Sequence, residues 1–572
     1  MAPLPLLFHT VPVNTSSRKP PADFDALVIG AGHNGLVCAC YLARAGLRVA
    51  VFERRGIVGG AAVTEEFVPG FRNSSASYTV SLLDSAVIRD LRLAEHGLRI
   101  LERPMQNFFP LPDGDSFSAG PQSEATLAEV RRYSQRDAAR LGDFLALLDR
   151  AVALLRSLLH RTPPTDLRRV GDLWELLRFG REFRALPLAQ QRELHEFFTR
   201  SAGELLDHWF ETEPLKALFG FDSVVGSYAS PYTPGSAYVL LHHAFGEVNG
   251  KSGLWGHAVG GMGAITQALA AQARSLGVHI ECDAPVAKII TSRTSGRGAS
   301  GRSADGHVPV QASGLKLLDG RVFGAPRIVA NLGPKPLFLG LLAAEDLPAD
   351  FRAHIERWRV GSATFRMNVA MAELPRFSAR RSRADDTHLG AGIIIAPSLG
   401  YMDRAFADAR LQGISRAPIV EMLIPSTLDD TLAPAGAHVA SLFCQHFDYD
   451  LARPDAPERS WADPAMRETA AQLVIDTVDA CAPNFKASLL GHSALSPLDL
   501  EQRFGLAGGD IFHGALGLDQ LWAARPALGY GDYRTPVQGL YLCGAGAHPG
   551  GGVTGVPGSN AAREILRDRR RR

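Results

Sequence analysis

A strand, a glycine-rich turn and a helix near the start of the chain constrain its fold more than any other feature of the sequence. The apolar run 24–29 leads into Gly30-Ala31-Gly32-His33-Asn34-Gly35, a helical segment 36–45 and a second apolar run, 48–52. Glycines at the first, third and sixth positions of such a turn permit a tight bend, the approach of a pyrophosphate and close packing of helix on strand. This spacing predicts a βαβ unit that binds a dinucleotide.

An acidic side chain after the second strand indicates the kind of dinucleotide. Glu53 lies eighteen residues after Gly35, where a carboxylate can accept hydrogen bonds from a ribose. A carboxylate at this place suits the unphosphorylated ribose of FAD or NAD and disfavours NADP. We therefore expect the whole turn, including His33 and Asn34, to bind the cofactor together with Glu53.

A double glycine follows the acid and is expected to lie along the same ligand. Gly59 and Gly60, followed by Ala61, leave the backbone free to run beside an extended cofactor. Arg54 or Arg55 could meet its phosphates, although a solvated surface position is an equally good interpretation of either arginine.

A second glycine-rich loop, 544–555, follows an apolar strand near the end of the chain. So many glycines cost chain entropy unless something, such as a flat ring system, lies against the backbone. Cofactor contacts are expected from Gly544, Gly546, Pro549, Gly551, Gly552 and Val553. No second G-x-G-x-x-G follows a strand, so we expect a single dinucleotide and an electron acceptor other than bound NAD(P).

The middle of the chain separates into a helical part and a mixed part. Apolar residues at spacings of three and four predict helices from 124 to 219, and strands alternate with helices after 253. The stretch 292–313 is dense in Gly, Ser and Arg, which is typical of an exposed hairpin tip or a flexible insert. Residues 1–21 are predicted to be a disordered leader.

Composition excludes several classes of protein. The 60 basic and 59 acidic side chains nearly cancel, which argues against a nucleic-acid partner. The six cysteines form no C-x-x-C, which is typical of a reducing compartment, and the spacing of His and Cys predicts no metal site. No apolar run approaches the roughly 20 residues of a membrane span. The leucine-rich segments 145–159 and 173–183 are expected to pack against the core, with peripheral membrane contact as the alternative.

Several motifs together resemble the FAD amine-oxidase and phytoene-desaturase flavoproteins. They are the turn 30–35 with Glu53, the double glycine, Trp255 with Gly260-Gly261-Met262-Gly263-Ala264, and the terminal GLYLCGAGAHPGGGVTG. The likeness extends over nearly the whole chain. The cysteine pair of disulfide reductases is missing, so no disulfide chemistry is expected.

The resemblance implies an α/β fold in which a Rossmann-like FAD-binding domain is built from discontinuous segments and carries an inserted α+β substrate domain. The expected FAD-binding segments are 22–115, 245–338 and 525–572, and the expected substrate domain comprises 116–244 and 339–524. FAD would lie extended, with Val286 touching its adenine through the backbone.

The resemblance assigns no catalytic residue, because the flavin is itself the electron sink and a hydride transfer to it needs little from protein acids and bases. His548 in the glycine-rich loop and His513 before it are the candidates by position. For His513, and for His242 and His243, a packing role is the preferred interpretation. Pocket walls are expected at Tyr78, Trp255, Phe512 and Trp522.

The leading hypothesis is an FAD-dependent oxidoreductase of the phytoene-desaturase type. It would exchange a hydride between a small, largely apolar substrate and flavin N5, and pass electrons to oxygen, a quinone or another mobile acceptor. The alternatives are an amine oxidase, an NADPH-dependent saturase and a non-catalytic flavoprotein that acts as an interaction partner. Only seven of the 60 basic residues are lysine, and Ala, Arg and Gly are abundant, which indicates a GC-rich genome and favours a bacterial cytoplasm over a mitochondrial matrix.

Overall fold

A five-stranded parallel sheet carries the glycine-rich turn at the carboxyl end of its central strand. The computed structural model describes residues 24–120, 123–166, 169–293, 308–379 and 386–571. The strands lie in the order β11 (His279–Glu281), β2 (Val49–Phe52), β1 (Ala26–Ile29), β15 (Ile328–Ala330) and β21 (Leu540–Leu542), and every neighbouring pair is parallel. Strands β1, β2, β15 and β21 are buried throughout, as expected where a parallel sheet is covered on both faces.

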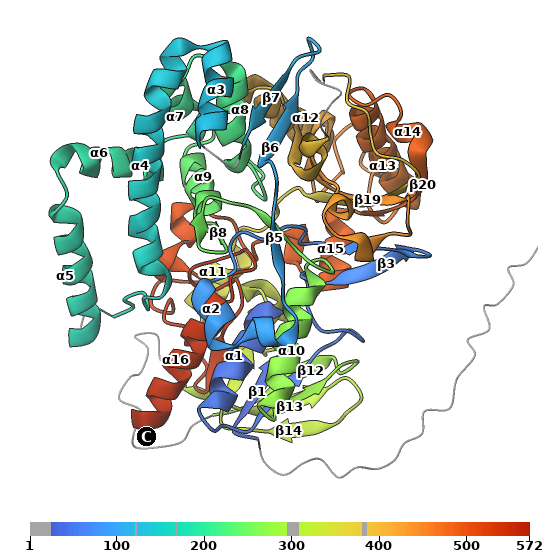
Figure 1. Cartoon of the computed structure of the whole chain (residues 1–572). Helices are drawn as coiled ribbons and strands as arrows, with labels where there is room; N and C mark the ends of the chain where they lie inside the picture. Colours follow the sequence, from blue (N-terminus) through green and yellow to red (C-terminus); the bar gives the residue numbers. More distant parts are fainter. Residues whose placement is uncertain (1–23, 121–122, 167–168, 294–307, 380–385, 572) are drawn as a thin grey trace, which may run out of the picture.

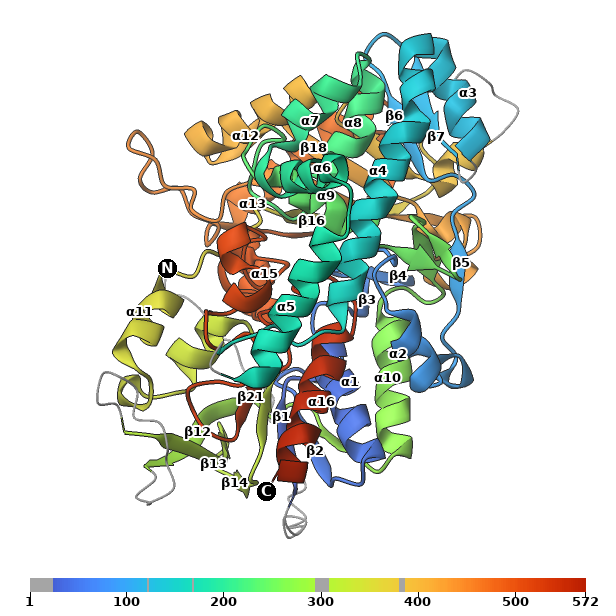
Figure 2. The same ribbon diagram turned by 90° about the vertical axis from the view of Figure 1, so that its left-hand side faces the viewer.

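Three helices lie on one face of this sheet, and a small antiparallel sheet covers the other (Figure 2). The helices are α1 (His33–Arg44), α10 (Gly263–Ser275) and α16 (Val556–Arg571), and the small sheet has the order β12 (Val286–Arg293), β13 (Val310–Leu317), β14 (Val322–Gly324). Phe52 of β2 meets Phe323 of β14 with ring centroids 4.7 Å apart. The two sheets therefore share one apolar core.

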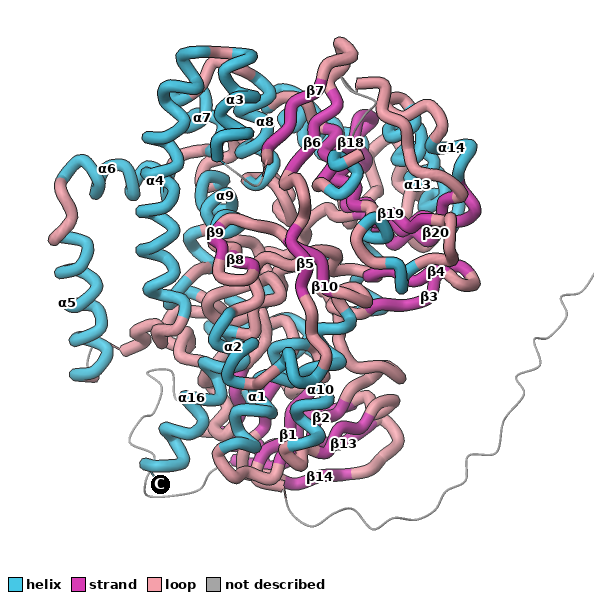
Figure 3. The backbone as a smooth tube through the Cα atoms, viewed as in Figure 1, coloured by secondary structure: helices cyan, strands magenta, loops and turns pink. Residues whose placement is uncertain are grey.

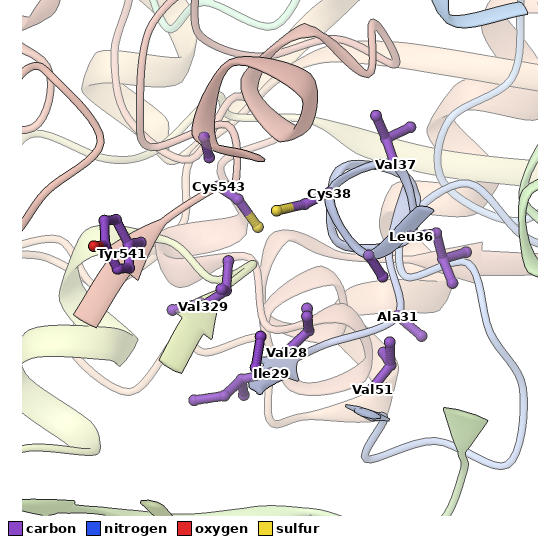
Figure 4. Packing of buried hydrophobic residues seen from close by; sticks show 14 of the residues in the cluster. Val28, Ile29, Ala31, Leu36, Val37, Cys38, Val51, Val329, Tyr541 and Cys543 are labelled. Atoms are coloured by element: carbon purple, nitrogen blue, oxygen red, sulfur yellow. The ribbon is translucent and has the colours of Figure 1, made fainter. Parts of the chain in front are cut away.

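The first and last parts of the described chain meet in this core. Strand β21 pairs with β15, and α16 packs against α1. Cys38 of α1 and Cys543, which follows β21, point their sulfurs toward each other among buried apolar side chains (Figure 4). Because parallel strands end at the same edge of a sheet, the loop after β21 lies beside the turn after β1. The predicted fold class, a Rossmann-like domain built from discontinuous segments, is confirmed.

A seven-stranded sheet forms the core of the other half of the molecule (Figure 1). In the described residues its pairing is antiparallel except between β17 and β6. Phe443 faces the side that packs on α12 (Leu399–Gln412), whereas Leu442 and Cys444 face α13 (Pro464–Asp479). The strand order is β20 (Leu489–Leu495), β16 (Phe365–Met371), β19 (His438–Phe447), β18 (Ile414–Leu423), β17 (Gly392–Ile395), β6 (Asn107–Pro110), β7 (Ser116–Ala119).

Helices fill the segment that the apolar spacing predicts to be helical (Figure 3). They are α3 (Ser123–Tyr133), α4 (Gln135–Leu159), α5 (Val170–Arg184), α6 (Leu188–Thr199), α7 (Ala202–Trp209) and α8 (Glu213–Asp222), followed by α9 (Ser236–Ala244). Helix α4 buries Phe144, Leu147 and Leu155, as expected for the segment 145–159. In the part of the chain that the structure describes, no helix combines the length and hydropathy that a bilayer crossing requires.

Helix α5 departs from the prediction. None of its described residues is buried, and Trp174 and Leu177 are 63% and 51% exposed. The prediction that the segment 173–183 packs against the core is met only in part: Phe179 and Phe183 pack against the core of the helical half, but α5 lies at the edge of the molecule and leaves its other apolar side chains exposed (Figure 1).

Strand pairing and side-chain packing place the junctions between the two halves differently from the predicted segments. Strand β6 lies within the expected FAD-binding segment 22–115 but is hydrogen-bonded into the seven-stranded sheet. Phe351 and Ile355 of α11 (Ala349–Glu356), within 339–524, pack into the core of the nucleotide-binding half. The remaining elements are β3 (Thr64–Val68), β4 (Phe71–Ser74), α2 (Ser85–Asp90), β5 (Ile100–Glu102), β8 (Glu247–Val248), β9 (Lys251–Ser252), β10 (Gly256–Ala258), α14 (Phe485–Ser488) and α15 (Pro497–Phe504).

Two predicted segments fall largely outside the described residues. These are the leader 1–21 and residues 294–307 of the insert 292–313. The described ends of the insert are strand residues, since Ser292 pairs with Gln311 and Arg293 with Val310. Residues 292–293 and 310–313, which the prediction included in the insert, thus belong to the ladder of β12 and β13.

Candidate functional site

The glycine-rich turn brings the start of α1 against the ends of β1 and β15. Gly30 has a φ of +91°, which glycine adopts without strain, and a Cβ on Gly35 would clash with the Gly30 carbonyl oxygen. The Asn331 side chain lies 3.2 Å from Gly32 N and 3.3 Å from Gly35 N when its amide oxygen faces them. The glycines thus permit the close helix–strand approach that exposes the first amides of α1.

Glu53 is held beside this turn with capacity for further hydrogen bonds. It is 5% exposed, and its two carboxylate oxygens accept from Ala31 N at 2.8 Å and from Arg55 N at 3.0 Å. A carboxylate offers about four acceptor positions, so lone pairs remain for hydroxyl donors.

A cavity, here the dinucleotide cavity, runs along the turn. Most of the cofactor residues that the first part of the sequence predicts line it, but Gly35 does not. Pro285, Asn331, Leu332 and Phe504 complete much of the wall. The predicted residues on its lining are Gly30, Gly32, His33, Asn34, Glu53, Arg54, Gly59, Gly60, Ala61 and Val286.

The two arginines after Glu53 have different surroundings. Arg55 is half-buried and forms an ion pair with Glu65 at 2.6 Å, a carboxylate that Arg503 also contacts at 2.8 Å. Arg54 is exposed and donates to Gln502 O at 3.0 Å. Both arginines line the dinucleotide cavity, so either could meet a phosphate there.

A second cavity, here the chamber, adjoins the first. His33, Ala61, Leu506, His513 and Ala545 line both cavities and form the boundary between them. Of the predicted pocket walls, Tyr78, Trp255 and Phe512 line the chamber, as do Val80, Leu82, Val225, Met262, Phe443 and Ile511. The lining is largely apolar, which suits a ligand with few polar groups.

The terminal glycine loop contributes less to these walls than its composition predicts. Gly552 and Val553 line the chamber, whereas Pro549 and Gly551 line a neighbouring cavity. A Cβ on Gly544 would lie 3.1 Å from the Leu332 carbonyl oxygen, and one on Gly546 would lie 2.5 Å from Pro334 Cδ. The glycines at 544 and 546 are thus required for contact with the protein segment 332–334 and line neither the chamber nor the dinucleotide cavity.

Two half-buried histidines, His33 and His513, line both cavities and each has a buried ring nitrogen there. His33 Nε2 and His513 Nδ1 have no hydrogen-bond partner within the described protein. Burial lowers the pKa of both side chains to about 4, so both are neutral at pH 7. Unpaired buried nitrogen atoms are costly, and a ligand in the path would satisfy them.

Of the other candidate histidines, His548 and His243 have hydrogen-bond partners within the protein, whereas His242 Nε2 has none among the described residues and lines a neighbouring cavity. His548 Nε2 lies 3.0 Å from Leu158 O, and its ring meets Trp522 edge to face at 4.6 Å, away from the lining of both cavities. His243 lines the chamber and bonds through Nδ1 to Val239 O at 2.9 Å. His513 is thus the candidate histidine with a free nitrogen at the cavity junction.

Comparison with known proteins agrees with this geometry. A family model described as an NAD(P)-binding Rossmann-like domain matches residues 28–115. Over 568 residues the chain is 41% identical to pyridine nucleotide-disulfide oxidoreductase domain-containing protein 2 of Rattus norvegicus, a match that covers 96% of this chain and 94% of the relative. The chain belongs to the family of pyridine nucleotide-disulfide oxidoreductase domain-containing protein 2.

More distant relatives of the chain have names that describe redox reactions. A limonene dehydrogenase component of Castellaniella defragrans and phytoene desaturase (neurosporene-forming) of Cereibacter sphaeroides are each 25% identical, and each match covers 95% of this chain and 94% of the relative. Cyclohexylamine oxidase from Brevibacterium oxydans shares the fold, with a TM-score of 0.54 at 15% identity over 96% of this chain and 99% of that structure. The chain is thus placed among the oxidoreductases, as the sequence predicts.

Two residues of the site escaped the sequence-based prediction. Asn331 follows β15 and turns its amide toward the start of α1. Arg525 is fully buried and donates to Phe512 O at 2.7 Å, to Ala545 O at 2.9 Å and to Gln520 O at 3.0 Å. Neither Asn331 nor Arg525 belongs to a recognisable motif. The only signal in the sequence for Asn331 was its position directly after a strand.

Buried histidines predict a loss of stability in mild acid. Burial lowers the pKa of His33, His243, His513 and His548 to about 4 and that of His242 further, against about 6.5 in an unfolded chain. Between these values the unfolded chain binds more protons than the folded chain, so the free energy of unfolding falls as the pH falls from 6.5 to 4.

Urea unfolding of the ligand-free protein at pH 7.5, 6.5, 5.5 and 4.5 checks this expectation. Burial also lowers the pKa of His438 and that of His446 to about 3. Burial acts in the opposite direction on four carboxyls, since it raises the pKa of Asp222 to about 8 and raises those of Glu421, Asp510 and Asp532, but the histidines are the larger group. A free energy of unfolding that is constant or larger at pH 4.5 than at pH 7.5 would contradict the assignment of neutral histidines.

In the described ranges, no group of three or more His, Cys, Asp and Glu side chains is arranged to hold a metal ion.

Proposed function

We propose that the protein is an FAD-dependent oxidoreductase of the phytoene-desaturase type, which exchanges a hydride between a largely apolar substrate and flavin N5. One observation carries the proposal: the dinucleotide cavity, which Glu53 lines, adjoins an apolar chamber at His33 and His513. The names of the limonene and phytoene enzymes among the distant relatives support an apolar substrate.

The residues present fit an extended FAD. The free lone pairs of Glu53 suit the hydroxyls of the adenosine ribose, and the first amides of α1 suit the pyrophosphate. Val286 lines the same cavity at the place proposed for the adenine. The unpaired nitrogens His33 Nε2 and His513 Nδ1 would be satisfied by polar atoms of the cofactor at the junction.

The protein itself binds the cofactor, orients the substrate and excludes water from the chamber. When bound, FAD supplies the acceptor for the hydride. Trp255, Phe512 and the other apolar walls exclude water from the chamber and leave the substrate few orientations. A mobile acceptor such as oxygen or a quinone is part of the proposal, since one dinucleotide fingerprint supports one tightly bound cofactor.

An amine oxidase is the second candidate. Tyr78 and Phe443 stack with ring centroids 5.2 Å apart and both line the chamber, which gives the aromatic pair that amine oxidation beside a flavin would need. Release of hydrogen peroxide driven by amines would favour this candidate over the first.

Glu53→Gln is expected to weaken FAD binding about tenfold, the loss of one charge-assisted hydrogen bond to a ribose hydroxyl. Glutamine keeps the shape of the side chain and one acceptor oxygen, so that the fold should persist. Fluorescence titration of the FAD-free protein with FAD measures the affinity. Glu66→Gln, at a solvent-exposed position on β3, is the control and should bind FAD like the unmodified chain.

Anaerobic reduction of the bound flavin tests the proposed function. Absorbance of the flavin should bleach when an apolar cell extract is added without oxygen. A flavin that dithionite reduces but that no extract reduces would contradict the proposal and support a non-catalytic flavoprotein. Bleaching by NADPH alone would instead support a saturase.

A further inference from the structure

The walls of the chamber separate it from the surface of the molecule. Every described residue that lines it is buried or half-buried. A substrate is therefore expected to reach the chamber through a neighbouring cavity. Two neighbouring cavities share lining residues with the chamber. One of them is the dinucleotide cavity, which the cofactor would fill, so the second is the route that stays open.

The second of these neighbours, here the vestibule, reaches the surface. It is the cavity that Pro549 and Gly551 line, and it lies where the end of α4 approaches α2 and the start of α16 (Figure 2). Ser85 and His160 on its lining are exposed, and the His160 side chain is 47% exposed. A molecule from solution can therefore enter the vestibule without any movement of the core.

Ser81 and Leu82 form the boundary between the vestibule and the chamber, because both residues line both cavities. Leu82 is half-buried, and its Cδ1 would lie 2.7 Å from a Cβ added at Gly552. Gly552 itself lines the chamber. The tip of the leucine side chain thus rests against the terminal glycine loop, at the place where a substrate would pass.

The main chain around Leu82 is anchored on both sides. The Ser81 carbonyl oxygen accepts from Glu247 N at 2.8 Å, and Asp84 N donates to Thr554 O at 3.1 Å. Both hydrogen bonds join the loop before α2 to distant parts of the chain, so this loop is not free to swing away. Rotation about side-chain bonds between staggered rotamers needs no such rupture. The Leu82 side chain is therefore the movable part of the boundary.

The vestibule offers mainly apolar surface to a passing molecule. Two of its charged side chains are engaged, since Asp84 pairs with His160 at 3.0 Å and Arg156 donates to Phe245 O at 2.7 Å. Glu247 supplies a further negative charge, which disfavours anions. The apolar part of the wall comprises Leu82, Leu83, Leu159, Phe245, Pro549 and Val556. The route thus suits an apolar molecule without negative charge.

We propose that Leu82 is the gate between the vestibule and the chamber, a specificity-determining residue whose side chain sets the width of the molecules that reach the flavin. The inference rests on the proposed function, because it concerns access to the same chamber. A bulkier side chain at this position should exclude wide molecules more than narrow ones, and a smaller side chain should admit wide ones. A residue that only supports the fold would affect both kinds of molecule alike.

Two quinones of different width test the proposal. One equivalent of dithionite reduces the FAD-loaded protein without oxygen, and stopped-flow absorbance then follows reoxidation, in which the quinone gains the hydride and a proton and becomes a hydroquinone. The narrow probe is 1,4-benzoquinone, with one ring, and the wide probe is menadione, with two fused rings. For Leu82→Trp we expect the second-order rate constant to fall about tenfold with menadione and less than about twofold with 1,4-benzoquinone. Leu82→Ala should raise the menadione rate constant about threefold and leave that of 1,4-benzoquinone unchanged.

Leu518→Trp is the matched control. Leu518 is 51% exposed and lines a cavity that shares no lining residue with the chamber, so both rate constants should stay unchanged. The proposal is overturned if Leu82→Trp slows the two quinones equally or not at all, if Leu518→Trp slows menadione as much, or if neither quinone reoxidises the flavin of the unmodified protein. Where Leu82→Trp does not fold or bind FAD, the ratio of the two rate constants in Leu82→Ala decides. An overturned gate in a protein whose flavin apolar extracts still reduce would leave the proposed function standing, whereas a protein that binds no FAD would remove it.

Discussion

Replacing Gly35 with alanine is expected to destabilise the protein and to abolish tight FAD binding, although alanine is the better helix former. At an ordinary helix position this change stabilises by about 1 kcal/mol. Here the new Cβ would clash with the Gly30 carbonyl oxygen and lie 3.0 Å from the side-chain amide of Asn331, so that the start of α1 must move away from β1. We expect the free energy of unfolding to fall by about 2 kcal/mol, as in overpacked cores.

The displacement of α1 should affect the cofactor more than the fold. The first amides of α1 would no longer converge on the pyrophosphate, and we expect FAD affinity to fall about a hundredfold, or about 3 kcal/mol. Gly142→Ala in α4 is the matched control, since nothing lies within 4 Å of its added Cβ. Urea unfolding and FAD titration of both variants would contradict the account if Gly35→Ala proved as stable and as tight in FAD binding as Gly142→Ala.

Arg525→Lys is expected to be the most damaging conservative substitution in the site. The guanidinium of Arg525 joins the segment that contains Phe512 to the loop that contains Ala545, with donors 2.7 Å and 2.9 Å from those carbonyl oxygens. A lysine presents one ammonium group that cannot reach both carbonyls and Gln520 O in the same geometry. The buried carbonyls left unpaired should lower the free energy of unfolding by about 3 kcal/mol.

The same substitution should loosen the walls of both cavities, because Ala545 lines both and Phe512 lines the chamber. FAD should therefore dissociate faster from Arg525→Lys than from the unmodified protein. Arg416→Lys is the control, since Arg416 is exposed and pairs with Asp408 at the surface, and it should leave unfolding unchanged. A free energy of unfolding equal to that of the control would show that Arg525 does not hold the two segments together.

The sequence predicted the nucleotide-binding half well because its signals are local. One βαβ unit contains the strand, the turn with glycines at 30, 32 and 35, and the acid at 53. The structure places these features as their spacing indicates. The apolar spacing of three and four likewise predicted the helices between 123 and 222. Such patterns arise from the backbone geometry of a single element and need no knowledge of its neighbours.

Features that depend on distant partners could not be predicted. Helix α5 has the apolar spacing of a packed helix, but nothing in the segment shows that other elements cover only part of it, at Phe179 and Phe183. The glycines at 544 and 546 were expected to face a ring system, and they instead admit the segment 332–334, which is more than 200 residues away in the chain. Asn331 and Arg525 lie in no motif, since their roles come from tertiary contacts alone.

The flavin content of the purified protein tests the central claim most directly. After denaturation, the account predicts the release of one FAD for each chain and of no tightly bound NAD(P). Release of NAD in place of FAD, or a colourless protein that stays colourless after incubation with FAD, would contradict it.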